Sequence, residues 1–177
     1  MSFYPTEHRK GIQGELDFGG ILTKTFGGTV EKTLKSVDMF DHIDLLWTHN
    51  FDGKKNPVGF DVKSASKAKR SDPESTRGTV AFVEILNRSG NIGSLRGKSD
   101  YMAYEGKDEW YVINRRSLLN YLLTAYPYSE EKIRVVGSKD RYNYFEWSRR
   151  YGNKDAIMLL PISFLKEKSS MIIPKNS

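Results

Sequence analysis

Short apolar runs of β-strand type recur along this chain, and this pattern limits its fold more than any other feature. The runs lie at 43–47, 58–62, 79–86, 101–105, 110–114 and 155–160. Runs of this length, bounded by turn residues, are typical of strands. The first two runs are separated by Asn50, Asp52, Gly53 and Pro57, so they are predicted to pair as a hairpin.

Helical patterns stand among these strands. Residues 117–126 place four leucines on one stripe, with Asn114 or Ser117 as N-cap and Pro127 after the end. Weaker patterns predict helices over 11–25 and 163–168, an edge strand over 132–136 and an exposed polar loop over 64–79. Because the elements are mixed rather than strictly alternating, we expect an α/β fold with a mixed central β-sheet flanked by helices.

Length and hydropathy predict one soluble domain. The chain has 177 residues, of which 38% are hydrophobic, which suits a single core over 1–170 followed by a loose tail over 171–177. The N-terminal residues have no apolar leader pattern, and no apolar stretch approaches the roughly 20 residues that a membrane span requires. We therefore expect no membrane partner and a cytoplasmic location, in the host cytoplasm if the source is a virus.

Charge and residue content narrow the function. Twenty-eight Lys and Arg residues against 22 Asp and Glu give a formal charge of +6, which favours a polyanionic partner such as nucleic acid. The absence of cysteine excludes disulfides, thiolate metal sites and cysteine nucleophiles. The three histidines are too scattered to predict a histidine metal site, and no phosphate-binding P-loop motif occurs.

Charged residues inside two apolar runs form the candidate site. Strand side chains alternate between faces, so Asp61 and Lys63 share one face while Phe60 and Val62 take the other. Asp44 lies in the preceding strand of the predicted hairpin, also between apolar neighbours. Two carboxylates that converge beside a lysine suit a hard divalent cation such as Mg²⁺, with Mn²⁺ as a substitute, and hence phosphodiester chemistry.

The order of these residues resembles the PD-(D/E)xK nuclease superfamily, in particular its small phage and resolvase-type members. Glu15 on the first helix, Asp44 in the hairpin and Asp61-Val62-Lys63 on the next strand follow the family's order. The resemblance covers about residues 11–66 and implies a restriction-endonuclease-like core. It also implies that Asp44 and Asp61 bind metal, that Lys63 orients or activates the attacking water, and that Glu15 completes the site.

Several assignments stay open at this point. Asp41 competes with Asp44, and Ile43 stands where the motif name has proline. Glu84, another acid inside an apolar run, is an auxiliary candidate. A second interpretation is an RNase-H-like nuclease that uses Asp44, Glu84 and either Asp100 or Asp155, and a third is a non-catalytic nucleic-acid-binding or inhibitory protein on a nuclease fold.

Basic residues flank the candidate site. Residues 56–70 contain four basic residues against one acidic residue, and 132–154 contain seven against two, with aromatic residues among them. This mixture is typical of surfaces that track a nucleic-acid backbone and stack on bases. The residues predicted to bind nucleic acid are Lys67, Lys69, Arg70, Arg141, Arg149 and Arg150. We expect a structure-selective DNA nuclease, with RNA as an open alternative, in which a homodimer would supply the second active site.

Overall fold

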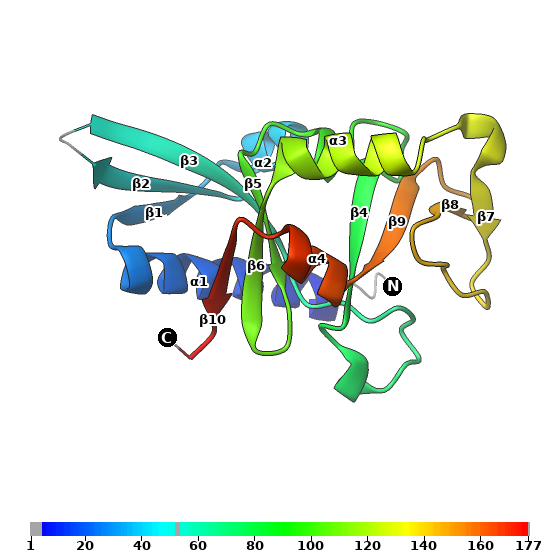
Figure 1. Ribbon diagram of the computed structural model, residues 1–177, viewed down its shortest axis with the longest axis horizontal. Helices are drawn as coiled ribbons and strands as arrows, with labels where there is room; N and C mark the ends of the chain where they lie inside the picture. Colours follow the sequence, from blue (N-terminus) through cyan, green and yellow to red (C-terminus); the bar gives the residue numbers. More distant parts are fainter. Residues whose placement is uncertain (1–4, 52–53, 177) are drawn as a thin grey trace.

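Two mixed β-sheets, with helices on both sides of the larger one, organise the chain (Figure 1). The computed structural model describes residues 5–51 and 54–176. The predicted mixed α/β class is confirmed, with the strands divided between two sheets that form one compact domain.

The larger sheet has six strands in the order β1-β2-β3-β5-β6-β10. Its strands are β1 (Thr29–Lys32), β2 (Leu45–Phe51), β3 (Lys54–Lys63), β5 (Tyr101–Glu105), β6 (Glu109–Asn114) and β10 (Met171–Pro174). β3 and β5 are parallel, and the other neighbouring pairs are antiparallel. The predicted hairpin is confirmed as β2 and β3, which project together from the body of the molecule (Figure 1).

The smaller sheet has four strands in the order β4-β9-β8-β7. They are β4 (Val80–Leu86), β9 (Ala156–Pro161), β8 (Trp147–Arg150) and β7 (Arg134–Val136). A β-bridge between Ser66 and Val80 joins the segment after β3 to the start of β4. The two sheets therefore meet next to the C-terminal end of β3, where the candidate site was predicted.

Four helices complete the described part of the fold. They are α1 (Pro5–Phe26), α2 (Lys35–Asp41), α3 (Arg115–Ala125) and α4 (Ile162–Lys168), with 3₁₀ turns η1 (Glu74–Thr76), η2 (Ser94–Arg96) and η3 (Glu130–Lys132). The predicted cap of α3 is Asn114, whose side-chain oxygen accepts from the Ser117 backbone N–H at 3.0 Å. None of the described helices is long and apolar enough to cross a membrane.

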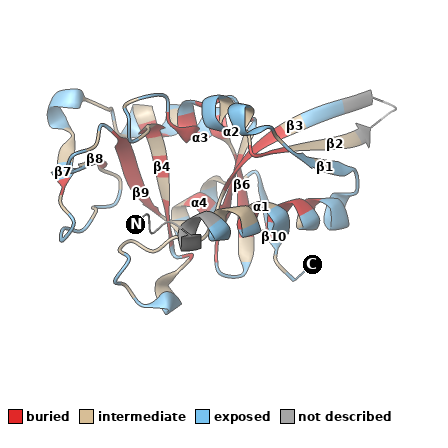
Figure 2. Cartoon of the chain, turned by 180° about the vertical axis from the view of Figure 1, so that it is seen from behind, coloured by how far each residue is buried: buried red, intermediate tan, exposed pale blue. Residues whose placement is uncertain are grey.

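Side-chain alternation along β3 divides the interior into two cores. Phe60 and Val62 pack with Phe18 and Leu22 of α1 in one cluster. The opposite face of the larger sheet contributes to a second cluster, which lies against β4, β9, α3 and α4. Buried residues concentrate at the base of β3 and in β4, β6 and β9 (Figure 2). Asp61 is thus a charged group on a strand that is covered on both faces.

Most predicted elements are confirmed to within a few residues, but the C-terminal segment and three short elements differ from the prediction. The expected loose tail over 171–177 is wrong for Met171–Pro174, which forms β10 against β6 and buries Ile173. This segment is ordered as a strand because Ile173 packs in the apolar cluster that includes Phe18 and Leu22 of α1. Lys175, just after the strand, also contacts Glu105 at 2.8 Å. The sequence analysis also did not predict α2, β1 and β8.

Candidate active site

Asp44 and Asp61 lie close together at the base of the β2–β3 hairpin, where the charge of Asp61 acts on Asp44. Asp44 was predicted to lie within the first strand of the hairpin, but it comes just before β2, whose first residue, Leu45, is paired with Phe60 of β3. The Asp44 backbone N–H donates to the Phe60 carbonyl at 2.8 Å. Its side-chain Oδ2 accepts from the Val62 backbone N–H at 2.7 Å. The structure therefore brings the two predicted metal ligands together on one face.

Lys63 completes this cluster. Its Nζ lies 2.5 Å from Asp61 Oδ1, and its side chain is 36% exposed. Asp61 is only 1% exposed and Asp44 is 8% exposed. Apart from the ion pair, neither carboxylate oxygen of Asp61 has a hydrogen-bond partner among the described residues. Buried carboxylates normally have their hydrogen-bonding capacity filled, so Asp61 retains capacity for a ligand.

Burial and mutual repulsion set the protonation of the cluster. Burial, followed by the negative charge of Asp61, raises the pKa of Asp44 to about 8. Burial alone would favour neutral Lys63, but the charges of Asp61 and Asp44 outweigh it and hold the pKa of Lys63 above its usual value. The raised pKa of Asp44 favours its protonated form, and the raised pKa of Lys63 keeps the lysine charged.

Asp38 of α2 is a site residue that the sequence analysis missed. Its side chain is within hydrogen-bonding range of Asp44, and this contact also raises the pKa of Asp44. Asp41, the predicted rival of Asp44, instead pairs with Lys98 at 2.9 Å. The acid-rich stretch 38–44 was the available signal, but only the short helix α2 decides which of its acids faces the hairpin.

Glu15 lies beside the cluster rather than within it. Its Oε2 contacts Lys32 Nζ of β1 at 2.6 Å, and its side chain is 15% exposed. The hydrogen bond with Glu15 is the main cause that raises the pKa of Lys32, with smaller contributions from the charges of Asp38 and Asp44. Lys32 is therefore paired with Glu15 and lies within electrostatic range of Asp38 and Asp44. It is a second site residue that the sequence analysis missed.

Glu84 approaches the cluster from the smaller sheet. Burial raises the pKa of Glu84, whereas the positive charges of Lys63 and Arg150 oppose this rise. The reciprocal influence of Glu84 on Lys63 places the two groups within electrostatic range. This position fits the auxiliary role predicted for Glu84, which stays a prediction.

The two further acids of the RNase-H-like interpretation have other partners. Asp100 Oδ2 accepts from the Gly59 backbone N–H at 2.8 Å and so ties β5 to β3. Asp155 is fully buried, and both of its carboxylate oxygens contact Arg150. Neither acid completes a cluster with Asp44, which weighs against that interpretation.

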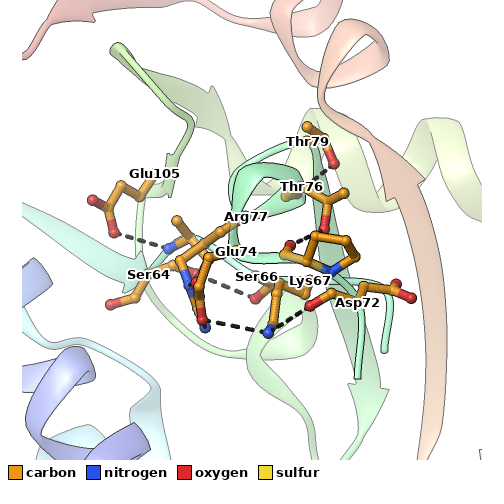
Figure 3. Close-up of polar contacts among 11 residues, drawn as sticks. Ser64, Ser66, Lys67, Asp72, Glu74, Thr76, Arg77, Thr79 and Glu105 are labelled. Carbon is orange, nitrogen blue, oxygen red and sulfur yellow. Dashed lines mark hydrogen bonds and ion pairs between the residues drawn. The ribbon is translucent and has the colours of Figure 1, made fainter. Parts of the chain in front are cut away.

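The basic residues of the β3–β4 loop are held by contacts within the protein (Figure 3). Lys67 Nζ donates to the Asp72 carbonyl at 2.8 Å and contacts Glu74 Oε1 at 3.3 Å. Lys69 Nζ donates to a backbone carbonyl of the segment between β7 and β8 at 2.6 Å. Arg141 contacts the Asp72 carboxylate at 3.3 Å, although its side chain is 72% exposed. These contacts fasten the loop to the smaller sheet.

The arginines of β8 are paired as well. Arg149 forms a forked contact with the Glu130 carboxylate at 2.5 and 2.8 Å, and Arg150 pairs with Asp155. Arg70 is exposed. The six basic residues therefore include several with a structural task, and their binding of nucleic acid stays a prediction.

Carboxylate oxygens are the donors that Mg²⁺ and Mn²⁺ prefer, and the unpartnered oxygens of Asp61 beside Asp44 fit such an ion. Over residues 5–51 and 54–176, however, no group of three or more His, Cys, Asp or Glu side chains is arranged to hold a metal. The candidate centre thus offers two protein carboxylates, with water and substrate left to supply the other ligands.

Comparison of the chain with models of known protein families, with curated proteins and with solved structures finds no match. The site must therefore be interpreted from its own geometry.

Proposed function

We propose that this protein is a metal-dependent nuclease that hydrolyses phosphodiester bonds in DNA. The observation that carries the proposal is the buried pair Asp44 and Asp61, close together at the base of a hairpin, with Lys63 ion-paired to Asp61 at 2.5 Å. A fold gains nothing in stability from two buried acids that repel each other, so the pair suggests a functional demand. RNA is the alternative substrate.

In this proposal Asp44 and Asp61 hold Mg²⁺ or Mn²⁺. The bound ion would supply Lewis acidity, which neutralises charge on the scissile phosphate and promotes ionisation of the attacking water. Asp44 must lose its proton to serve as a ligand, because its pKa is raised to about 8. Metal loading should therefore improve as the pH rises toward 8.

Lys63 acts in this scheme as a fixed positive charge. Its raised pKa keeps the ammonium group charged across the physiological range, so it is a poor general base. Its partly exposed end is placed to orient water and to stabilise the negative charge that develops on the phosphate.

The order of elements supports the resemblance to PD-(D/E)xK nucleases. A first helix with Glu15 is followed by a hairpin with Asp44 and by a strand with Asp61 and Lys63, as in that superfamily. The pairing of Glu15 with Lys32 departs from the implied role, because it turns this acid to a lysine rather than toward Asp61. Selectivity for junctions, flaps or ends, a homodimer and a cytoplasmic location remain parts of the proposal.

The experiment measures cleavage of plasmid, single-stranded, flap and four-way-junction DNA with Mg²⁺ or Mn²⁺. Asp61→Asn and Lys63→Ala should abolish cleavage while DNA binding persists. Asp41→Asn is the matched control, because Asp41 lies near in sequence but pairs with Lys98. Loss in Asp61→Asn together with full activity in Asp41→Asn supports the proposal.

Other outcomes favour the rival interpretations. Binding without cleavage on all four substrates would indicate a non-catalytic nucleic-acid-binding protein. Cleavage that survives Lys63→Ala and is lost in Glu84→Gln would favour the RNase-H-like nuclease. Repetition of the assay with matched RNA substrates decides between the two nucleic acids.

A further inference from the structure

Tyr104 is a buried polar residue next to the candidate site whose hydroxyl group has no partner. The residue is 1% exposed, and no residue in the described part of the chain accepts from or donates to its hydroxyl. An unsatisfied buried hydroxyl destabilises a fold, because it has lost its hydrogen bonds with water and gained none in return. Such groups are few in native proteins, and each one calls for an explanation.

The sheet register places Tyr104 beside Lys63. β3 and β5 are parallel, with Asp61 paired to Met102 and Lys63 paired to Tyr104. Residues paired in this way project from the same face, so Tyr104 shares its face with both Asp61 and Lys63. Burial raises the pKa of Tyr104, and the charge of Asp61 raises it further. The phenol thus stays protonated and available as a donor.

A pocket of about 310 Å³ lies at this place. Its lining includes Lys63, Ser66 and Tyr104, together with part of α1 and the first residues of β4. The space is ample for water molecules, which need two or more polar partners to be held in order. Lys63 and Tyr104 line this space, whereas the Tyr104 hydroxyl and both carboxylate oxygens of Asp61 are buried behind it.

We propose that Tyr104 is a positioning residue, whose hydroxyl is the hydrogen-bond donor for the carboxylate of Asp61, the neighbouring buried acceptor on the same face that lacks a hydrogen bond. The proposal rests on the nuclease assignment, because it gives Tyr104 the task of fixing Asp61 in the orientation that binds metal. Groups that orient a metal ligand commonly contribute about 10–100-fold to metal affinity or activity.

Tyr104→Phe tests this role, because it removes the hydroxyl and keeps the ring. Tyr111→Phe is the matched control: Tyr111 is paired with Tyr104 across β5 and β6, but its hydroxyl already donates to Glu109 at 2.9 Å. The measurements are the Kd for Mn²⁺ by calorimetry, kcat and KM for DNA cleavage, and the melting temperature.

For Tyr104→Phe we expect the Kd for Mn²⁺ to rise and kcat to fall by about 10-fold each. KM should be unchanged, and the melting temperature should be equal to or above that of the wild type. Tyr111→Phe should match the wild type in Kd and kcat.

Results that differ from these expectations show whether the role of Tyr104 or the nuclease assignment itself is wrong. If the wild type binds Mn²⁺ and cleaves DNA, and Tyr104→Phe does both equally well, the role of Tyr104 is overturned while the nuclease assignment stands. A fall in melting temperature without a change in Kd would show a packing role instead, and would also overturn the proposal. If the wild type neither binds Mn²⁺ nor cleaves any substrate, the nuclease assignment falls and this proposal falls with it.

Discussion

Asp61 and Asp155 are buried to almost the same degree, but only the Asp155 carboxylate has hydrogen-bond partners for both of its oxygens. Asp155 is 0% exposed, and its two carboxylate oxygens contact the backbone N–H and the guanidinium group of Arg150. Asp61 is 1% exposed, and beyond its ion pair with Lys63 it has no hydrogen bond with a described residue. It also lies within electrostatic range of a second buried carboxylate, Asp44.

The difference separates a structural acid from a functional one. Arg150 at the end of β8 bonds to Asp155 just before β9, so the pair holds together the two ends of the turn between these strands. A carboxylate with its hydrogen bonds filled in this way stabilises the local fold. At Asp61 the fold tolerates repulsion and unfilled hydrogen-bonding capacity, which is the usual price of a site that binds a ligand. Substitutions at the two positions should therefore have opposite signatures.

The largest expected effect is on catalysis by Asp61→Asn. We expect cleavage to fall by more than about 100-fold, because loss of an outer group that orients a ligand already costs about 10–100-fold. The free energy of unfolding should change by less than about 1 kcal/mol, because the loss of the ion pair with Lys63 is offset by relief of the repulsion between Asp61 and Asp44. Steady-state cleavage and urea denaturation on the same preparation check both numbers.

Asp155→Asn should lower the free energy of unfolding and leave cleavage nearly unchanged. Removal of one partner from a buried pair costs about 3–5 kcal/mol, and the partial exposure of Arg150 reduces this to about 2–3 kcal/mol. Cleavage per folded molecule should stay within about 2-fold of the wild type, because the Asp155 carboxylate bonds to Arg150 and shares no hydrogen bond with Asp44, Asp61 or Lys63. A stable Asp155→Asn protein that no longer cleaves would break the comparison.

A smaller effect is expected from the pH dependence of Asp44. Its pKa is 3.8 when unperturbed and about 8 in the folded protein. The folded state therefore binds more protons than the unfolded state between these values, and the contribution of Asp44 to stability is lost as the pH rises toward 8. Asp44→Asn removes this loss and keeps an oxygen acceptor for the Val62 N–H.

We expect Asp44→Asn to gain about 2 kcal/mol of unfolding free energy over the wild type between pH 6 and pH 8, in metal-free buffer. Urea denaturation at the two pH values measures the gain, and Asp41→Asn provides the control for a change of surface charge. A gain that is the same at both pH values would show that Asp44 does not titrate in this range.

The sequence contains enough information to predict the centre of the site. Alternation along 60–63 puts Asp61 and Lys63 on one face, and a hairpin with turn residues at its tip must bring the preceding run alongside. The proximity of Asp44 to Asp61 follows from these local rules. Helix α3 is equally predictable, because its leucine stripe and its Asn114 cap are local signals.

Other parts of the site depend on contacts that local patterns do not reveal. Helix α2 has no side-chain cap and no buried residue, so nothing in its sequence marks Asp38 as the acid that faces Asp44. Arg149 and Glu130 are 19 positions apart, and their ion pair exists only because β8 lies beside β7 and η3. Tyr104 looks like an ordinary core residue until the β3–β5 register places it beside Lys63.

The most direct test of the central claim is to locate a metal ion by anomalous diffraction from crystals soaked in Mn²⁺ at pH 8. We expect an anomalous peak within about 2.5 Å of carboxylate oxygens of both Asp44 and Asp61, and no peak at this place in Asp61→Asn. A wild-type crystal that cleaves bound DNA with its Mn²⁺ peak elsewhere, or that binds no Mn²⁺ between the two acids, would contradict the account.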